Sequence, residues 1–312
     1  MRNINSFPKE AKTQEVKDTI LAGLFVLPFA AIHFGAQIIF PFLLSVSFCV
    51  LFDFGGQFLF SAKPKKFDLT SVLTGMIIAF SLPATSPKYF YIIAAAFATL
   101  VTKHPFGGYG NNIFNPAAGG LAFVTISFSE EFFDYSALQR EIDSGVRVLG
   151  ALREWHLPEL DKFHVLIGNQ LGSMGSTQIL AIVVCLAYLC YKKAISGRIV
   201  WPFLLTCSAI ALAFPRAGGC RLESLFYELF SGMLLFSAVF MFTDPVTAPE
   251  LPISRVLYGV LSGVLVMLFR YFGRFEEGVV FVVLIVNSLA KGIDAIAKKY
   301  RRRKKRLKQV RH

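Results

Sequence analysis

Long apolar stretches separated by short polar segments dominate the pattern along this chain. The hydrocarbon core of a bilayer is about 30 Å thick, so a crossing α-helix needs about 20 predominantly apolar residues. On that measure the sequence predicts helices near residues 19–34, 37–60, 69–83, 88–103, 115–129, 177–192, 198–214, 224–242, 253–271 and 277–297. The helices at 69–83 and 115–129 are short enough to be broken or re-entrant. We therefore predict an all-α integral membrane protein with about ten transmembrane helices.

The composition agrees with this class. Hydrophobic residues make up 54% of the 312 residues and charged residues only 17%, whereas a soluble domain carries more charge on its solvated surface. The chain holds 33 phenylalanines, which are favourable against lipid. A soluble enzyme is excluded.

The net charge of +12 is concentrated at the C-terminus. Residues 298–312 contain ten Lys and Arg and no acidic residue. A nucleic-acid surface would spread its charge over a folded domain, so we exclude nucleic acid as a partner. The terminal run favours a topogenic segment that contacts the anionic cytoplasmic leaflet.

The distribution of Lys and Arg also predicts the orientation. The predicted cytoplasmic loops are basic at 63–66, Lys103, 192–198 and Arg255, whereas the loop 130–176 has four Lys/Arg against eight Asp/Glu. The positive-inside rule then puts both termini in the cytoplasm of a multi-pass protein in the cell (inner) membrane. The first 18 residues lack the layout of a cleaved signal peptide.

Two parts of the sequence resemble each other. Thr74-Gly75-Met76-Ile77-Ile78 precedes a Pro-x-Thr-x-Pro turn at 83–87, and Ser231-Gly232-Met233-Leu234-Leu235 precedes another at 245–249. The copies are five predicted helices apart, so they run antiparallel across the membrane. This pattern predicts an inverted repeat with a site between interrupted helices. The units would be a cytoplasmic segment 1–18, a first five-helix repeat 19–129, an extracytoplasmic loop 130–176, a second repeat 177–297 and a basic tail 298–312.

A glycine-rich segment precedes the predicted helix at 115–129. Gly107 and Gly108 permit unusual backbone angles and close backbone approach. Asn115 followed by Pro116 is typical of a helix start, whose free amide groups suit an anion or a flavin edge. Tight helix packing through small residues explains the same pattern equally well.

Two acidic residues lie in or next to apolar segments, where a charge is costly unless it is paired, solvated or functional. Asp53 lies within a predicted helix, so an ion path and a structural pair are equally plausible. Asp244 precedes Pro245 and either caps that turn or lies on an ion path.

The other reactive side chains form no recognisable site. The five cysteines have no Cys-x-x-Cys pair, and His156 and His164 lie in a loop without metal-ligand spacing. We predict no catalytic residue and no metal site.

Five segments in order along the chain resemble the NqrB/RnfD family of membrane electron-transfer subunits, and RnfD more closely. They are 68–75 with Leu82-Pro83, 106–117, 168–175, 243–249 and 277–287. The resemblance implies ten helices in two inverted halves, within a complex that transfers electrons between ferredoxin and NAD and transports Na⁺ or H⁺. The other subunits of such a complex and membrane lipid are the expected partners.

The family's FMN is joined through its phosphate to a threonine in a motif like Asp-x-x-Ser-Gly-Ala-Thr. In this sequence Glu141 takes the Asp position, Ser144-Gly145 match, Val146 replaces Ala, and Arg147 takes the Thr position. Because arginine has no hydroxyl group, we predict no covalent FMN. FMN or riboflavin, if present, would be non-covalent; Ser144 is a weak alternative attachment point, and Arg147 could hold a phosphate by charge-assisted hydrogen bonds.

Two other functions suit the same pattern. Ten helices in inverted halves also suit a stand-alone transporter or channel, and loss of the flavin threonine also suits a non-redox scaffold. Co-purification distinguishes the transporter, because only a complex subunit requires membrane and iron–sulfur partners.

Overall fold

The computed structural model describes residues 9–60, 67–108, 110–135, 138, 146–216, 220–275 and 277–309. Every regular element in this part of the chain is helical. The N-terminal elements are α1 (Lys9–Phe34), η1 (Ala36–Ile38), α2 (Ile39–Phe60), α3 (Leu69–Ser81), α4 (Lys88–Ala96), the π-helix η2 (Phe97–Lys103), η3 (His104–Phe106) and α5 (Pro116–Ser127). Short helices follow: α6 (Ser129–Phe132), α8 (Val148–Arg153) and α9 (Lys162–Ile167). The C-terminal elements are α10 (Ile179–Tyr191), α11 (Gly197–Ala213), α12 (Arg221–Leu229), α13 (Leu234–Phe240), α14 (Pro252–Phe272) and α15 (Val279–Gln309).

Four helical stretches in the described residues are long and apolar enough to cross a membrane: Thr13–Phe34, Ala36–Phe60, Pro252–Phe272 and Val279–Arg301. The bent pair α12 and α13 qualifies as a fifth. Four shorter apolar helices are α3, α5, α10 and α11. The molecule is thus a helical membrane protein, and each predicted range contains helix, while the number of crossings stays a prediction.

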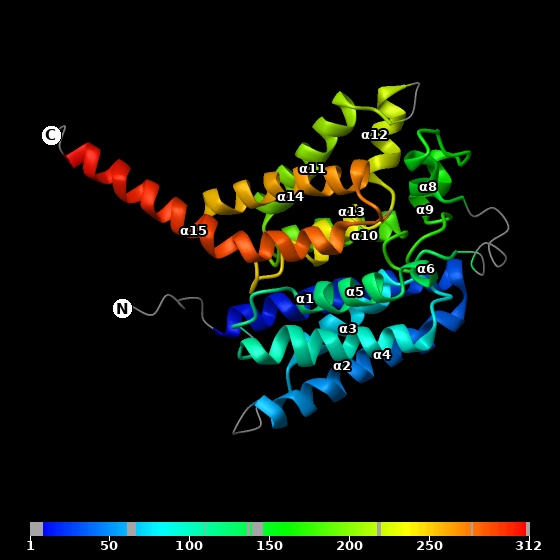
Figure 1. The fold of residues 1–312 in the computed structure, drawn as a ribbon, viewed down its shortest axis with the longest axis horizontal. Coiled ribbons are helices and arrows are strands. Elements are labelled where there is room, and N and C mark those ends of the chain that lie inside the picture. The colour runs from blue at the N-terminus through cyan, green and yellow to red at the C-terminus, as the bar shows by residue number, and fades with distance from the viewer. Residues whose placement is uncertain are drawn as a thin grey trace.

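The helices form two groups that lie one above the other in Figure 1, with α1–α5 below and α10–α15 above. The start of α1 and the end of α15 lie at the left, which we call the termini end. Helices α6, α8, α9 and α12 lie at the right, which we call the α8 end.

The packing within the two groups follows the same pattern. In the first group α2 packs against α3 and α4, α5 packs against α4 and η2, and α1 packs against α3. In the second group α11 packs against α12, α13 and α14, α15 packs against α14, and α10 packs against α13. The groups meet through α1 with α10 and through α5 with α15.

Small residues permit the closest helix contacts. A Cβ on Gly120 of α5 would overlap the backbone carbonyl of Ala94 in α4, and a Cβ on Gly259 of α14 would lie 2.5 Å from Ile199 O in α11. Close approach through small residues is a common way for membrane helices to pack.

Three predicted helices differ in detail from the structure. The helix predicted at 224–242 is interrupted, because α12 ends at Leu229 and α13 resumes at Leu234 with a bend of 47°. The segment 88–103 is helical but changes from α to π at Phe97, and the helix predicted at 277–297 continues to Gln309.

Candidate functional site

The structure contains a pocket at each end of α3 and α13. Both helices are deeply buried: all seven residues of α13 and Thr74–Ser81 of α3 are shielded from solvent. The rings of Phe80 and Phe236 meet between them, with centroids 6.3 Å apart. Apolar side chains therefore separate the two pockets.

The termini-end pocket lies where α5 begins and α13 ends. Its polar lining residues are Thr19, Thr70, Thr74, Lys103, Asn112, Asn115, Thr243 and Asp244. Its apolar lining residues include Leu73, Ile77, Val239 and Phe240. Two predicted site residues, Asn115 and Asp244, thus meet in one pocket.

Asn115 is the N-cap of α5, as its sequence predicted. Its side chain accepts a hydrogen bond from Ala118 N at 3.2 Å, and Pro116 occupies the first turn. The backbone N–H of Asn115 donates to Asn287 Oδ1 at 2.9 Å, and Asn287 Nδ2 donates to Tyr258 Oη at 2.8 Å. This buried chain of hydrogen bonds joins the start of α5 to α14 and α15.

Asp244 caps the turn that follows α13. Its carboxylate accepts hydrogen bonds from Val246 N at 3.2 Å and from Thr247 Oγ1 at 2.9 Å. The turn-capping role predicted as one alternative is therefore present, and the same side chain also lines the pocket.

Gly107 and Gly108 form the turn after η3 and do not line either pocket. Their φ values of 99° and 75° lie in the left-handed region, which glycine adopts readily. The turn brings the backbone back to the end of η2, where Gly108 N donates a hydrogen bond to Lys103 O at 3.2 Å.

Asp53 belongs to a buried ionic group beside the termini-end pocket. Its Oδ1 lies 2.8 Å from Lys103 Nζ and 2.9 Å from His104 Nε2. Gln57 Nε2 donates to its Oδ2 at 3.0 Å. The structural pair predicted as one alternative for Asp53 is thus present.

Lys103 lies in the interior of the protein. We counted it among the charges of the cytoplasmic loops, at the end of the helix predicted over 88–103; in the structure it ends the π-helix η2 and is only 2% exposed. Its pairing with Asp53, and with Asp68 Oδ2 at 2.9 Å, explains how the charge is tolerated in the interior.

The α8-end pocket lies where α3 ends and α13 begins. Its lining residues are Ser81, Phe132, Phe133, Tyr135, Arg147, Leu149, Gly150, Gln170, Leu171, Gly172, Ser173, Gly232, Met233 and Glu277. The lining thus combines three aromatic rings, those of Phe132, Phe133 and Tyr135, with a small number of polar groups.

Arg147 lines this pocket at the start of α8. Its guanidinium carbon lies 5.1 Å from the centre of the Tyr135 ring, which is a cation–π contact. Ser144, the weak alternative for flavin attachment, lies outside the described residues.

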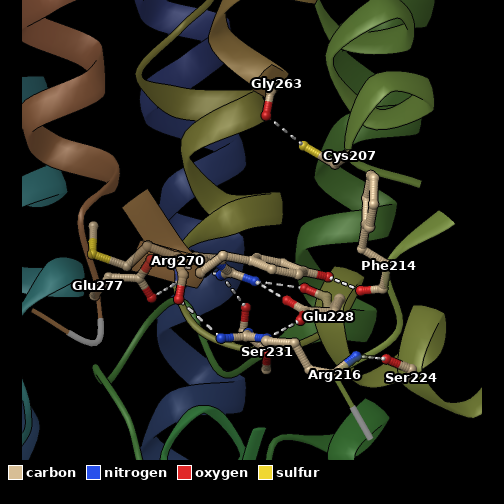
Figure 2. Close-up of polar contacts among 11 residues, drawn as sticks. Cys207, Phe214, Arg216, Ser224, Glu228, Ser231, Gly263, Arg270 and Glu277 are labelled. Atoms are coloured by element: carbon tan, nitrogen blue, oxygen red, sulfur yellow. Dashed lines mark hydrogen bonds and ion pairs between the residues drawn. The ribbon is translucent and has the colours of Figure 1, made fainter. Parts of the chain in front are cut away.

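The break between α12 and α13 is held by a buried ionic cluster of Arg216, Glu228, Arg270 and Glu277 (Figure 2). Arg216 Nε lies 2.5 Å from Glu228 Oε1, and Arg270 Nη1 lies 3.4 Å from Glu228 Oε2. Arg270 Nη2 lies 3.5 Å from Glu277 Oε1. The four formal charges sum to zero, so each buried charge faces an opposite one.

The same side chains satisfy the backbone at the break. Arg270 donates to Glu228 O at 2.7 Å and to Ser231 O at 2.8 Å, and Glu277 Oε2 accepts from Met233 N at 2.7 Å. Within the described residues, Arg216 Nη2 and Arg270 Nε have no hydrogen-bond partner. The sequence alone did not predict this cluster, because its four members lie in separate segments of the chain, some apolar and some loops, and share no local motif.

Comparison with known proteins gives consistent matches. A family model described as "NQR2, RnfD, RnfE family" matches residues 8–302. The D subunit of the ion-translocating oxidoreductase complex of Actinobacillus succinogenes is 28% identical over 304 residues, which cover 84% of this chain and 85% of that protein. The protein of the same name from Salmonella typhi is 30% identical over 268 residues, with 73% and 75% covered.

Proposed function

Since this chain belongs to the NQR2, RnfD and RnfE family, we propose that it is a membrane subunit of an Rnf-type ferredoxin:NAD oxidoreductase complex. In this role it couples electron transfer to the translocation of Na⁺ or H⁺ and works together with other subunits. The observation that carries the proposal is the extent of the family match, which runs from residue 8 to residue 302 through both helix groups and the segment between them.

The two helix groups are inverted five-helix repeats in this proposal. Support comes from their shared packing pattern, in which α2, α3, α4 and α5 correspond to α11, α12 with α13, α14 and α15. The contacts of α1 with α10 and of α5 with α15 pair equivalent helices, as a pseudo-two-fold axis requires.

The proposed topology has ten crossings of the cell (inner) membrane and both termini in the cytoplasm. The start of α1 and the end of α15 share the termini end in Figure 1, in support of this arrangement. The acidic segment with α8 and α9 is then extracytoplasmic.

The two pockets suit a protein that passes ions or electrons across a membrane. Asp53 and Asp244 lie in or beside the termini-end pocket, and Arg147 lies in the α8-end pocket. Sites at the ends of interrupted helices are common in transporters, where broken helices expose backbone groups to a ligand.

The residue at the family's attachment position argues against a covalent flavin. Arg147 occupies the position of the family's attachment threonine, and its guanidinium group forms no phosphoester. We therefore assign this chain no covalent FMN. FMN or riboflavin, if bound, would be held without a bond to the protein, with Arg147 as the residue that could hold a phosphate, and would supply the redox chemistry that side chains lack.

Affinity purification tests the proposed function. The tagged chain is extracted from its native membrane in a mild detergent, with an unrelated tagged membrane protein as the control. We expect further membrane subunits and iron–sulfur proteins to co-purify with the chain and not with the control. Recovery of the chain alone would contradict the proposal and favour a stand-alone transporter or channel.

A further inference from the structure

The last helix continues beyond the apolar span beside it. α15 runs without a break over 31 residues, from Val279 to Gln309. Asp294 marks the level at which α14 begins, because its carboxylate accepts hydrogen bonds from Glu250 N at 2.8 Å and from Leu251 N at 3.2 Å. The part of α15 after Asp294, which we call the extension, therefore lies beyond the start of the neighbouring span.

The extension is longer than the lipid headgroup layer is thick. From Asp294 to Gln309 the helix rises roughly 22 Å, at about 1.5 Å per residue. The polar layer on one side of a bilayer is only about 5–8 Å thick. Figure 1 shows this end of α15, drawn in red, pointing away from both helix groups. Headgroups thus surround the base of the extension, and its last turns lie beyond them.

The extension has no residue at which it would bend onto the membrane surface. Sharp bends in helices occur at proline, at Gly/Ser pairs and at π-bulges. The sequence between Gly292 and Gln309 contains no Pro, Gly or Ser, and the helix stays α-helical to its end. In the topology proposed above, its distal part is therefore presented to the cytoplasm.

The distal part of the extension carries only positive charge. Residues 301–306 are six consecutive Arg and Lys, and 298–312 contain no acidic residue. Like charges at i,i+4 spacing, such as Arg302 with Arg306, destabilise a helix that stands alone. The favourable interaction of basic residues with the helix dipole is confined to the last turn. An anionic surface beside this helix would therefore stabilise it.

We propose that residues 300–309 dock onto an acidic surface of a cytoplasmic protein subunit. This inference rests on the proposed function, which puts further subunits beside this chain and the termini end in the cytoplasm. The length and direction of the extension favour a protein over lipid as the anionic partner. Charge complementarity of this kind orients the partner and accelerates its docking.

The test is site-specific photo-crosslinking of the full-length chain in its native membrane. A photoreactive phenylalanine analogue replaces Leu307 in the distal part or, as a control for lipid contact, Tyr300 at the base. We expect the Leu307 position to form an adduct with an Asp/Glu-rich segment of a protein that also co-purifies with the tagged chain. The yield should fall about fivefold or more between 0.1 M and 1 M NaCl, because the Debye length falls from about 10 Å to about 3 Å.

Two variants of the extension test whether its charge makes the contact. Changing all six residues at 301–306 to Gln should abolish the Leu307 adduct, whereas changing only the arginines among them to Lys keeps the charge and should preserve it. Lys298 and Lys299 stay unchanged in both, so the charges next to the membrane that favour the orientation remain. A protein adduct that survives both 1 M NaCl and the Gln changes would overturn the proposal.

Failure of this proposal is distinguishable from failure of the proposed function. If Leu307 crosslinks only to lipid or nucleic acid, or forms no adduct, while other subunits still co-purify, the docking proposal fails and the proposed function stands. If affinity purification recovers the chain alone, the proposed function itself fails. The salt comparison uses the unaltered basic run, so it decides the question even if the Gln variant is not inserted.

Discussion

Arg270 has more buried polar contacts than its sequence context suggests. It lies within the long apolar helix α14, yet its guanidinium group contacts Glu228, Ser231 and Glu277. Removing one partner from a buried ion pair leaves an uncompensated charge and costs about 3–5 kcal/mol. We therefore expect Arg270→Met to lower the free energy of unfolding by about 3 kcal/mol or more.

The measurement is thermal unfolding of the purified chain in detergent, with Lys162→Met as the control. Lys162 forms a single exposed ion pair with Glu223, and such pairs contribute little to stability. An Arg270→Met protein as stable as the Lys162→Met control would show that the cluster does not hold the break.

Arg147 tests the proposed non-covalent flavin. If its guanidinium group holds a flavin phosphate, Arg147→Ala should reduce the flavin that co-purifies with the complex about tenfold, since a charge-assisted bidentate contact is one of the stronger hydrogen-bonding arrangements. Arg153→Ala is the matched control, because Arg153 lies on α8 but outside the pocket. Unchanged flavin content in Arg147→Ala would count against this role.

Single residues also mark the limit of sequence reasoning. Asn115 as a helix cap followed from local sequence alone, because a cap is made within one turn. The burial of Lys103 could not be predicted in this way, because its partner Asp53 is 50 residues away. A Lys at the end of an apolar segment is usually a topogenic charge, and only the tertiary structure shows that it is paired.

Gly232 lies in the break between α12 and α13 in a conformation that suits glycine. Its φ of 58° is left-handed, and a Cβ at this position would overlap the carboxylate of Glu277 and the side chain of Leu149. A left-handed conformation costs a residue with a Cβ about 1–2 kcal/mol, before the overlap is counted. We expect Gly232→Ala to destabilise the chain by at least about 1 kcal/mol.

Gly55→Ala provides the matched control, since Gly55 lies within α2 and a Cβ added there would have no neighbouring atom within 4 Å. Alanine in a helix interior is favoured over glycine by about 1 kcal/mol, so this change should be neutral or stabilising. Thermal unfolding compares the two. A Gly232→Ala protein as stable as Gly55→Ala would contradict the account of the break.

The helices could be predicted because the length of an apolar segment is read directly from the sequence. The interruptions within helices were harder to predict. Ser231-Gly232 and Thr74-Gly75 are alike in sequence, yet the first is a break and the second is inside α3. The difference arises from Glu277 and Arg270, whose side chains form hydrogen bonds with the free backbone groups at 228–233. No local sequence pattern predicts these partners.

The whole molecule is organised as two similarly packed helix groups with a pocket at each end of the central helices α3 and α13. The sequence predicts a repeat because both copies keep a Gly-Met pair and a Pro-x-Thr-x-Pro turn. It does not locate the two pockets, because each combines residues from both groups. The sequence departs at 141, 146 and 147 from the flavin-attachment motif of the family it resembles, and we propose that Arg147, which has no hydroxyl group, carries no FMN.

The most direct test of this account is in-gel flavin fluorescence of the chain after co-expression with its partner subunits and a flavin transferase. The positive control is the variant Glu141→Asp, Val146→Ala, Arg147→Thr, which restores the family's attachment motif. We expect a dark wild-type band beside a fluorescent variant band. A fluorescent wild-type band that persists in Arg147→Ala and disappears in Ser144→Ala would place the covalent FMN on Ser144 and contradict the account.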